Sequence, residues 1–411
     1  MAHPLFAFAS TIRRLREGPL GSYVDRFADV LVNRGHTPRT AQKQVRIVSQ
    51  LSRWLVRRSM GVGAIDEQTI ERFLRDRWRR RCVVFTDRPA LRLFLESLRQ
   101  WNVVPRPRSV PERGIHPLEL SFTRYLERER GLSPKTIRGQ VRVVRRFLSD
   151  RRHRHRTAAG RLNASTVTGF VLSETRDAGP GKAAHISVGL RSFFRFLRLK
   201  GRIDRDLSSA VPSVPGWRLA ALPATLKWHQ VQHLLRQCDR RTPVGRRDFA
   251  ILMLMLRLGL RSGEVAALTL DDFRWDEGEV VVRGKGSRHH RLPLPRDVGQ
   301  SIVAYLKGGR PRCVSRQLFI RTRAPHTGLK TNGCVSTRVR TALARAGLHS
   351  PRQGSHLLRH TAASLMLRQG ASLFEIGQVL NHRHPDTTAL YAKVDLAQLR
   401  PLAQPWPGGV R

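Results

Sequence analysis

The stretch from Ser355 to Tyr391 holds side chains that together could transfer a phosphoryl group: His356, His382, Arg359 and the tyrosine itself. A phenol, with a pKa of about 10, is a poor nucleophile near neutral pH and needs a base or an electropositive site. A guanidinium group can bind phosphate in bidentate fashion and stabilise the charge that grows in the transition state. Because His356 and Arg359 are three residues apart, both project from one face of a helix.

Capping signals divide this stretch into three predicted helices. Ser355 is a good N-cap for the first, which ends at Gly370. Ser372 begins the second, with Glu375 in capping-box spacing, and Asp386 is expected to cap the third, which carries the tyrosine. The expected buried residues of the first two helices are Leu358, Ala362, Leu365, Met366, Leu373, Ile376, Val379 and Leu380.

Further helices and one β-hairpin are expected upstream. The predicted helices are Trp228–Cys238, Asp248–Leu258, one that begins at a Ser262 cap, Gly299–Lys307 and Gly333–Ala346. The predicted strands, Glu279–Arg283 and His289–Pro293, flank a turn that contains Lys285. Glycines on both sides of Lys285 would let the hairpin tip approach a ligand closely.

Net charge is the most informative global property of the chain. The sequence has 76 Lys and Arg against 30 Asp and Glu, a formal net charge of +46, and only nine of the 76 are lysines. A surface this basic repels itself and favours a polyanionic partner, and arginine suits bidentate phosphate contacts. A GC-rich genome could explain arginine over lysine but not the deficit of acids. Nucleic acid is therefore the expected partner.

We expect no metal, no cofactor and no membrane span. The four cysteines, Cys82, Cys238, Cys313 and Cys334, lack the paired spacing of zinc or redox sites. The longest apolar run, Phe249 to Leu256, is too short to cross a bilayer. The N-terminal charges follow the apolar patch, whereas in a signal peptide they precede it. The expected location is the bacterial cytoplasm, with association to the nucleoid when the protein is bound to DNA.

The first half of the chain contains an internal repeat. Gly35–Val48 aligns with Gly131–Val144 at an offset of 96 residues, with seven of fourteen positions identical. Leu91–Val104 aligns with Leu190–Ile203 at an offset of 99 residues. This small change of offset is typical of a loop insertion inside a duplicated module. Chance similarity between arginine-rich amphipathic helices is the alternative.

Each copy starts its main helix with a cap residue followed by proline. Thr37-Pro38 and Ser133-Pro134 place proline at the first helical position. Apolar residues then recur at helical spacing on one face, and basic residues occupy the other. The residues predicted to bind DNA on these faces are Arg39, Lys43, Arg46, Lys135, Arg138, Arg142 and Arg145.

Five motifs occur in a fixed order along the second half. They are Leu258-Gly-Leu-Arg261-Ser-Gly-Glu264, Gly284-Lys285-Gly286, His356-Leu-Leu-Arg359-His360, Leu380-Asn-His382 and Thr387-Thr-Ala-Leu-Tyr391. This order resembles the tyrosine recombinase (phage integrase) family over roughly Pro223 to Val394. The two upstream copies are similar, more weakly, to the family's helical DNA-binding domains. Each residue taken alone could instead be a surface arginine, a core histidine or a packing aromatic.

The resemblance implies a role for each matching residue. Tyr391 would attack a DNA phosphate, giving a 3′-phosphotyrosyl link and a free 5′-hydroxyl. Arg261 and Arg359 would hold the non-bridging oxygens, and Lys285 would donate a proton to the departing 5′ oxygen.

The remaining three positions would assist this reaction. His356 would act in proton transfer at the tyrosine, and His382 would support the scissile phosphate. Glu264 would be a supporting acidic residue. Where the family usually has Leu-Gly-His, this chain has Leu380-Asn381-His382, and asparagine also tolerates a left-handed helix end.

The predicted fold is mainly α, with helical DNA-binding arm domains and a mixed α/β catalytic domain that is mostly helical with a small antiparallel sheet. The predicted divisions are an N-terminal helical DNA-binding domain at 1–110, a core-binding helical domain at 111–212, a linker at 213–222, and a catalytic domain with a C-terminal tail at 223–411. Apolar residues at partly helical spacing after Tyr391 suggest that the tail packs on a neighbouring subunit.

The resemblance implies a site-specific recombinase whose partner is double-stranded DNA and which works through a Holliday junction as a tetramer on two DNA sites. The additional arm favours an integrase or transposase of a mobile element, with accessory or co-encoded recombinase proteins as further candidate partners. A type IB topoisomerase would use the same chemistry, but the duplicated arms and short tail argue against it. A catalytically silent DNA-binding regulator is the other alternative, and the complete set of catalytic positions disfavours it.

Overall fold

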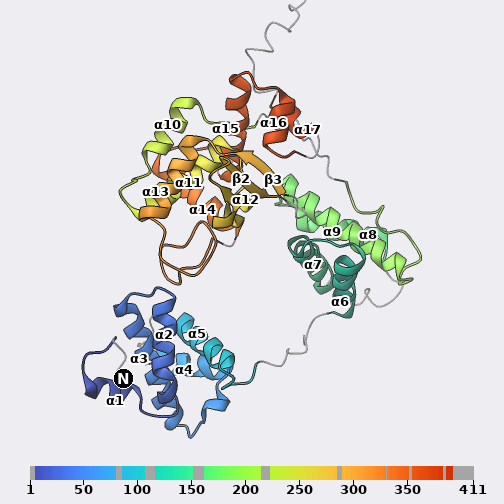
Figure 1. Cartoon of the computed structure of the whole chain (residues 1–411). Coiled ribbons are helices and arrows are strands. Elements are labelled where there is room, and N and C mark those ends of the chain that lie inside the picture. The colour runs from blue at the N-terminus through green and yellow to red at the C-terminus, as the bar shows by residue number, and fades with distance from the viewer. Residues whose placement is uncertain are drawn as a thin grey trace, which may run out of the picture. The chain divides into compact units, whose positions relative to one another are not determined.

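The computed structural model describes nine stretches of the chain, shown in Figure 1. These are residues 5–79, 86–106, 116–150, 162–213, 223–284, 289–329, 331–350, 354–382 and 386–391. Contacts divide the chain into two compact units, one formed by Met1–Arg106 with Ala221–Arg411 and the other by Pro107–Ala220. The domain limits expected from the sequence remain predictions. Within the described stretches, none of the helices combines the length and apolar character needed to span a membrane.

The N-terminal part, residues 5–106, is a group of helices around its own apolar core. Its α-helices are α1 (Ala9–Leu15), α2 (Val24–Asn33), α3 (Pro38–Val56), α4 (Glu67–Arg79) and α5 (Asp87–Gln100). Helix α3 is amphipathic, and its apolar face packs against α2 and α5. Phe27 and Phe94 meet edge to face in the core, with ring centroids 4.9 Å apart. The basic face of α3 is left at the surface.

The second unit has a corresponding set of helices. They are α6 (Pro117–Arg124), which continues as the π-helical turn η3 (Tyr125–Glu129), then α7 (Pro134–Ser149), α8 (Ala164–Thr175) and α9 (Pro180–Leu199). Its core is rich in phenylalanine, and Phe122 and Phe193 meet edge to face with ring centroids 5.3 Å apart. Helix α7 packs on α9 and α6 in the way that α3 packs on α5 and α2.

Local details repeat between the two sets of helices as well. Thr37 and Ser133 each cap their helix by accepting a hydrogen bond from the backbone N–H three residues on, both at 3.4 Å. Gly35 and Gly131 both have positive φ. Asn102 and Gly201, at the ends of α5 and α9, do so too, with φ of 57° and 61°. The stretches that repeat in sequence therefore also have equivalent local structure.

The part from residue 223 onward surrounds one buried helix. Helix α11 (Pro243–Arg257) packs on the four helices α12 (Ser262–Ala267), α13 (Arg296–Gly308), α14 (Asn332–Arg345) and α15 (Ser355–Arg368). Almost every side chain from Ala250 to Leu256 is buried, so this helix is the core of the part. Helix α10 (Trp228–Arg236) precedes it. The sequence placed the start of α11 at Asp248, which is wrong, because the helix begins five residues earlier, at Pro243. Its N-cap is Thr242, which accepts from Gly245 N–H at 3.0 Å.

A three-stranded antiparallel sheet in the order β1-β2-β3 flanks these helices. Strands β2 (Glu279–Arg283) and β3 (His289–Pro293) have the predicted limits, with Val281 opposite Arg291. The two-residue strand β1 (Phe273–Arg274) was not predicted, because it is too short to show alternation.

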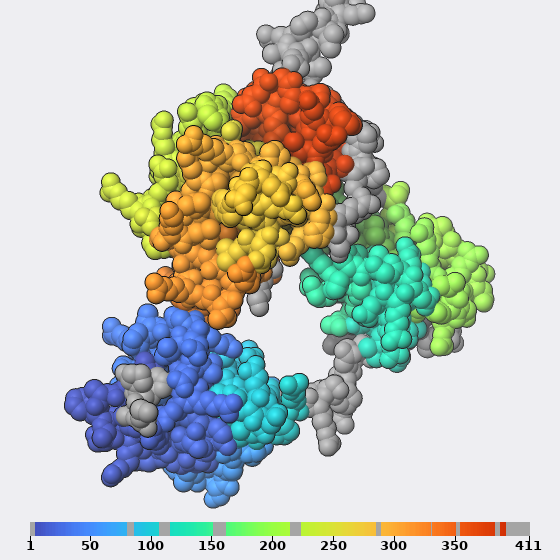
Figure 2. All heavy atoms as spheres, in the orientation of Figure 1, coloured from blue at the N-terminus to red at the C-terminus, as the bar shows by residue number. Residues whose placement is uncertain are grey.

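Three closing helices end the described chain: α15, α16 (Leu373–Val379) and α17 (Asp386–Ala389). In the space-filling view their red surface continues from the yellow and orange surface of the preceding helices (Figure 2). The capping box of Ser372 and Glu375 is confirmed. Ser355 is the first residue of α15, and the N-cap is Gly354, so that cap prediction is wrong. The Ser355 hydroxyl instead forms a hydrogen bond with Ser336 on α14, at 3.2 Å.

Candidate active site

The hydroxyl of Tyr391 lies at the centre of the candidate site. Tyr391 directly follows α17 and its turn, and only 2% of it is exposed. Its ring packs against apolar side chains of α15 and α16, among them Leu367 and Ile376. Burial raises the pKa of the phenol, although the charges of Arg359 and Arg261 act in the opposite direction. The hydroxyl is therefore protonated near neutral pH.

Arg359 is a buried cation held by two backbone carbonyls. It donates from Nη1 to the carbonyl of Gly259 at 2.6 Å and from Nη2 to the carbonyl of Leu380 at 2.5 Å. Burial, and then the charge of Arg261, lower the pKa of this guanidinium to about 10, so that it stays charged at neutral pH. Gly259 has a φ of 60°, and a Cβ there would lie 2.2 Å from Leu380. Glycine is thus needed at the carbonyl that orients Arg359.

Arg261 is fixed by Glu264 at the start of α12. The Glu264 carboxylate accepts from the backbone N–H of Arg261 at 2.7 Å and from its Nη1 at 2.8 Å. The side chain of Glu264 is 9% exposed, whereas that of Arg261 is 39% exposed. The nearly buried acid therefore holds the arginine in place, and the guanidinium remains accessible to a phosphate.

His382 stacks on the tyrosine. Its ring plane is within 10° of that of Tyr391, with centroids 6.2 Å apart. Its Nδ1 is hydrogen-bonded to Thr388 Oγ1 at 2.8 Å. Burial, and then the charges of Arg359 and Arg261, lower the pKa of His382 to about 4, so that it is a neutral imidazole at pH 7. Asn381, directly before it, has the left-handed conformation (φ 50°) expected from the sequence.

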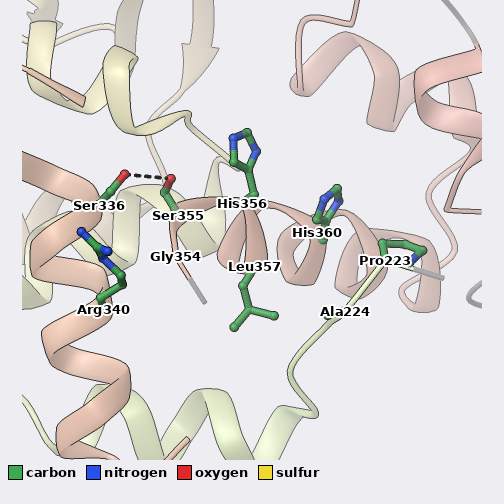
Figure 3. A pocket seen from close by; sticks show the side chains of 9 residues that line it. All are labelled: Pro223, Ala224, Ser336, Arg340, Gly354, Ser355, His356, Leu357 and His360. Atoms are coloured by element: carbon green, nitrogen blue, oxygen red, sulfur yellow. Dashed lines mark hydrogen bonds between the residues drawn. The ribbon is translucent and has the colours of Figure 1, made fainter. Parts of the chain in front are cut away.

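His356 lies at the rim of a pocket of about 520 Å³ beside α15. The residues that line it are Pro223, Ala224, Ser336, Arg340, Gly354, Ser355, His356, Leu357 and His360. Figure 3 shows His356 and His360 projecting from the same side of α15, with Leu357 on the opposite side. Partial burial, and then the charges of Arg359 and Arg261, lower the pKa of His356. A neutral imidazole near two cations suits an anionic ligand.

His360 is the site residue to which the sequence motifs gave no role. Its Nδ1 lies 3.0 Å from Tyr391 Oη. Its ring centroid is 5.6 Å from that of Tyr391 and 6.5 Å from that of His356. The available signal was its spacing, because a residue four positions after His356 shares a helical face with it.

Lys285 lies outside the described residues, as do the tail after Tyr391 and Cys82. The described hairpin strands end at Arg283 and resume at His289. Across the described stretches, His, Cys, Asp and Glu side chains do not gather in threes that could hold a metal ion.

The basic residues predicted on α3 and α7 all lie at the surface. They are Arg39, Lys43, Arg46, Lys135, Arg138, Arg142 and Arg145. Arg145 is also part of an ion pair, because its Nε lies 3.0 Å from the nearly buried carboxylate of Glu119. On α3 the exposed basic stripe continues to Arg53 and Arg57, which were not among the predicted DNA-binding residues.

A tyrosine, two fixed guanidiniums and three histidines thus meet on a mostly helical scaffold, which defines a phosphoryl-transfer site. The chain matches the phage integrase family over residues 224–398 and the phage integrase N-terminal SAM-like domain over residues 120–201. It is 41% identical to the putative integrase/recombinase y4rA of Sinorhizobium fredii, covering 97% of both chains. It is 29% identical to tyrosine recombinase XerD of Listeria monocytogenes, over 68% of this chain and 94% of that protein.

Solved structures share the fold. XerH site-specific recombinase bound to a palindromic difH substrate has a TM-score of 0.55 at 17% identity, covering 69% of this chain and 83% of that one. A lambda integrase dimer bound to a COC′ core site has a TM-score of 0.52 at 17% identity, covering 67% and 94%. The chain belongs to the phage integrase family of tyrosine recombinases, enzymes that cleave and rejoin DNA through a tyrosine-linked intermediate. The family and the mainly helical fold expected from the sequence are confirmed.

Proposed function

We propose that this chain recombines DNA at specific sites with Tyr391 as the nucleophile. The phenolic oxygen attacks the scissile phosphate, a 3′-phosphotyrosyl bond forms, and the 5′ oxygen leaves. The observation that carries this proposal is the meeting of Tyr391 Oη, itself bonded to His360 Nδ1 at 3.0 Å, with the Arg359 guanidinium held between two carbonyls. The covalent link conserves the energy of the phosphodiester, so rejoining needs no high-energy cofactor.

The cations of the site have separate tasks in this reaction. Arg261 and Arg359 bind the non-bridging oxygens and stabilise the charge of the pentacoordinate transition state. Lys285, at the hairpin turn, supplies the proton to the 5′ oxygen. Glu264 supports this arrangement by orienting Arg261.

The two histidines predicted from the sequence act around the same phosphate. His382, neutral at pH 7 and stacked on Tyr391, contacts the scissile phosphate as a hydrogen-bond donor. His356, at the rim of the pocket, takes part in proton transfer at the tyrosine indirectly, by exchanging protons with solvent on the open side of the site.

The DNA partner is a long duplex site that is read by both helical copies as well as by the catalytic part. The exposed basic faces of α3 and α7 support this, since each presents a row of cations along one side of a helix. The XerH structure is bound to its difH substrate, and the lambda integrase dimer is bound to a COC′ core site. For this chain we propose a tetramer that joins two sites through a Holliday junction, with the DNA of the nucleoid as its substrate.

The biological setting that fits best is a mobile element. Two relatives in Sinorhizobium fredii are named putative integrase/recombinase, and each matches nearly the full length of this chain, including the additional N-terminal copy. XerD of Listeria monocytogenes matches only 68% of the chain. Accessory or co-encoded recombinases are candidate partners of such an integrase or transposase.

Replacing the nucleophile tests the chemistry directly. Tyr391→Phe should bind DNA as tightly as the original protein and form no adduct, since the phenyl ring keeps the packing but lacks the oxygen. Incubation with a nicked DNA site, followed by denaturing gel electrophoresis, would reveal the covalent species. An adduct formed by Tyr391→Phe would exclude this tyrosine as the nucleophile.

A topoisomerase of the same chemistry and a silent DNA-binding regulator are the alternatives. Relaxation of a supercoiled plasmid that carries no recombination site would favour the topoisomerase. DNA binding without any adduct, under conditions that span pH and salt, would favour the regulator. Strand exchange between two marked sites would exclude both.

A further inference from the structure

The structure pairs the candidate nucleophile with a residue to which neither the motifs nor the family resemblance gives a role. Tyr391 Oη and His360 Nδ1 are 3.0 Å apart, although the two residues are 31 positions apart in the sequence. A phenol hydroxyl donates its hydrogen, so Nδ1 acts as acceptor when the imidazole carries its own proton on Nε2. The contact then has the geometry expected of a general base, because the imidazole nitrogen lies within hydrogen-bond distance of the hydroxyl that must lose its proton.

Burial makes such a base necessary. The pKa of the Tyr391 phenol is raised above its usual value of about 10, so at pH 7 at most about one molecule in a thousand carries the phenolate. The surrounding arginines ease ionisation but do not overcome the desolvation. Attack on phosphorus therefore requires a group that takes the proton as the new bond forms.

The other two histidines are placed less well for this task. His382 faces the phenol ring with its plane, its Nδ1 is already bonded to Thr388 Oγ1 at 2.8 Å, and its pKa of about 4 makes it a weak base. The His356 ring is exposed and lies one helical turn from His360, with their centroids 6.5 Å apart. Within the described ranges, His360 supplies the imidazole nitrogen that lies within hydrogen-bond distance of Oη.

We propose that His360 is the proton acceptor of Tyr391, a proposal that rests on Tyr391 being the nucleophile. In cleavage the Oη–H bond breaks and an Nδ1–H bond forms, while Oη bonds to phosphorus and the P–O5′ bond breaks. The 5′ oxygen takes its proton from the general acid of the leaving-group side. In rejoining, the 5′-hydroxyl gives its proton back to that group as O5′ bonds to phosphorus and the P–Oη bond breaks, and the His360 imidazolium returns its proton to the departing phenolate.

Several charged and titratable groups surround His360. They are His356 and Arg359 on its own helix, His382 after α16 and Tyr391 after α17. Arg261, before α12, is near enough to act on Arg359 and Tyr391. The bound phosphate, with its negative charge, then stabilises the imidazolium when it forms.

The decisive variant is His360→Asn, because Oδ1 of asparagine occupies nearly the position of Nδ1 and can accept the hydrogen bond but not the proton. We expect DNA binding and thermal unfolding to be unchanged, and adduct formation on a nicked site to slow about 10²–10⁴-fold. His233→Asn, on α10, is the matched control and should behave as the original protein. Full activity of His360→Asn would reduce His360 to a positioning residue and overturn the proposal.

The pH profile separates proton transfer from a structural defect. With His360 present, the rate of adduct formation should rise with pH and reach a plateau once the imidazole is neutral. In His360→Asn the rate should instead climb about tenfold per pH unit towards the pKa of the phenol, because only the phenolate reacts. If His356→Asn shows that climb and His360→Asn keeps the plateau, the assignment to His360 fails.

A change of leaving group tells the two sides of the reaction apart. DNA with sulfur in place of the bridging 5′ oxygen leaves as a thiolate and needs no acid. It should restore cleavage by Lys285→Ala but not by His360→Asn. Restoration of His360→Asn by this substrate would place His360 on the leaving-group side.

Failure of the proposed function would look different from failure of this inference. An adduct formed by Tyr391→Phe removes the nucleophile assignment whatever His360 does. Should the His360 variant unfold, NMR titration of the histidines in the unmodified protein and in Tyr391→Phe replaces it. Loss of the hydroxyl must alter the titration of His360, and an unaltered titration overturns the proposal.

Discussion

Glu264 sets the direction in which Arg261 faces. One carboxylate oxygen accepts from the backbone N–H of Arg261 and the other from its guanidinium, while the acid itself is almost buried. The acid therefore occupies one edge of the Arg261 guanidinium. The Arg261 side chain is 39% exposed, so the other edge can still contact a phosphate. Its charge also offsets part of the repulsion between Arg261 and the buried Arg359. A residue without any contact to DNA can in this way determine how DNA is held.

We predict that Glu264→Ala slows adduct formation by roughly 10²–10³-fold, about 3 to 4 kcal/mol of barrier, because a misplaced Arg261 no longer meets the phosphate. Glu264→Gln should lose less, since its amide oxygen can still accept from the backbone. Single-turnover cleavage of a nicked site measures both. Glu277→Ala is the control, because Glu277 makes an ion pair of the same i,i+3 spacing with Arg274 at the exposed surface. An equal loss in both alanine variants would contradict the role of Glu264.

Helix ends position the site at the scale of the secondary-structure elements. The carbonyl after α11 and the carbonyl at the end of α16 both receive Arg359, so the buried guanidinium joins elements that are distant in the sequence. Gly259 permits this, because the chain turns there with a positive φ and leaves room for Leu380. The orientation of this buried guanidinium thus depends on how α11 ends.

We predict that Gly259→Ala destabilises the protein by more than the roughly 1–2 kcal/mol expected for a left-handed alanine, because its Cβ also meets Leu380. Gly347→Ala is the matched control: Gly347 ends α14 with a φ of 62° and has nothing within 4 Å of the added carbon. Chemical denaturation would give both values. Cleavage should fall only in Gly259→Ala, and an equal destabilisation by the two substitutions would show that Leu380 can move aside.

The whole molecule is organised by its charge of +46 and by the repetition of one helical module. Acidic side chains pair with only part of the arginines: Arg88 with Glu71 in the N-terminal part, and Arg145 with Glu119 in the second unit. The exposed rows on α3 and α7 remain at the surface as cations along a helix. Such rows neutralise phosphates and release counterions, which makes binding steeply dependent on salt.

We predict that the replacement of Arg39, Lys43 and Arg46 by alanine lowers the slope of log affinity against log salt by about three, close to one for each phosphate that the protein no longer neutralises. Arg88→Ala, in the same part, is the control and should leave the slope unchanged, because Arg88 is paired with Glu71. Fluorescence titration with a long duplex at several salt concentrations measures the slope. An unchanged slope in the triple variant would mean that the first copy does not touch DNA.

Local interactions are what the sequence revealed reliably. The capping box of Ser372, the hairpin strands and the left-handed Asn381 all depend on residues a few positions apart, so the order of residues along the chain is sufficient to predict them. The motif order identified the family for the same reason. The start of α11 was missed because the prediction followed the apolar run, which begins after the first turn, although Thr242-Pro243 is the same start signal as Thr37-Pro38.

Tertiary structure alone decided which side chains meet. The bonds from Arg359 to the carbonyls of Gly259 and Leu380, and from His360 to Tyr391, join residues 100, 21 and 31 positions apart. Helical spacing placed His356 and Arg359 on one face, but it did not show that His360 would be the histidine to reach the hydroxyl of Tyr391, which lies after another helix. That choice depends on how α15, α16 and α17 pack, and packing is a property of the assembled core that no local pattern encodes.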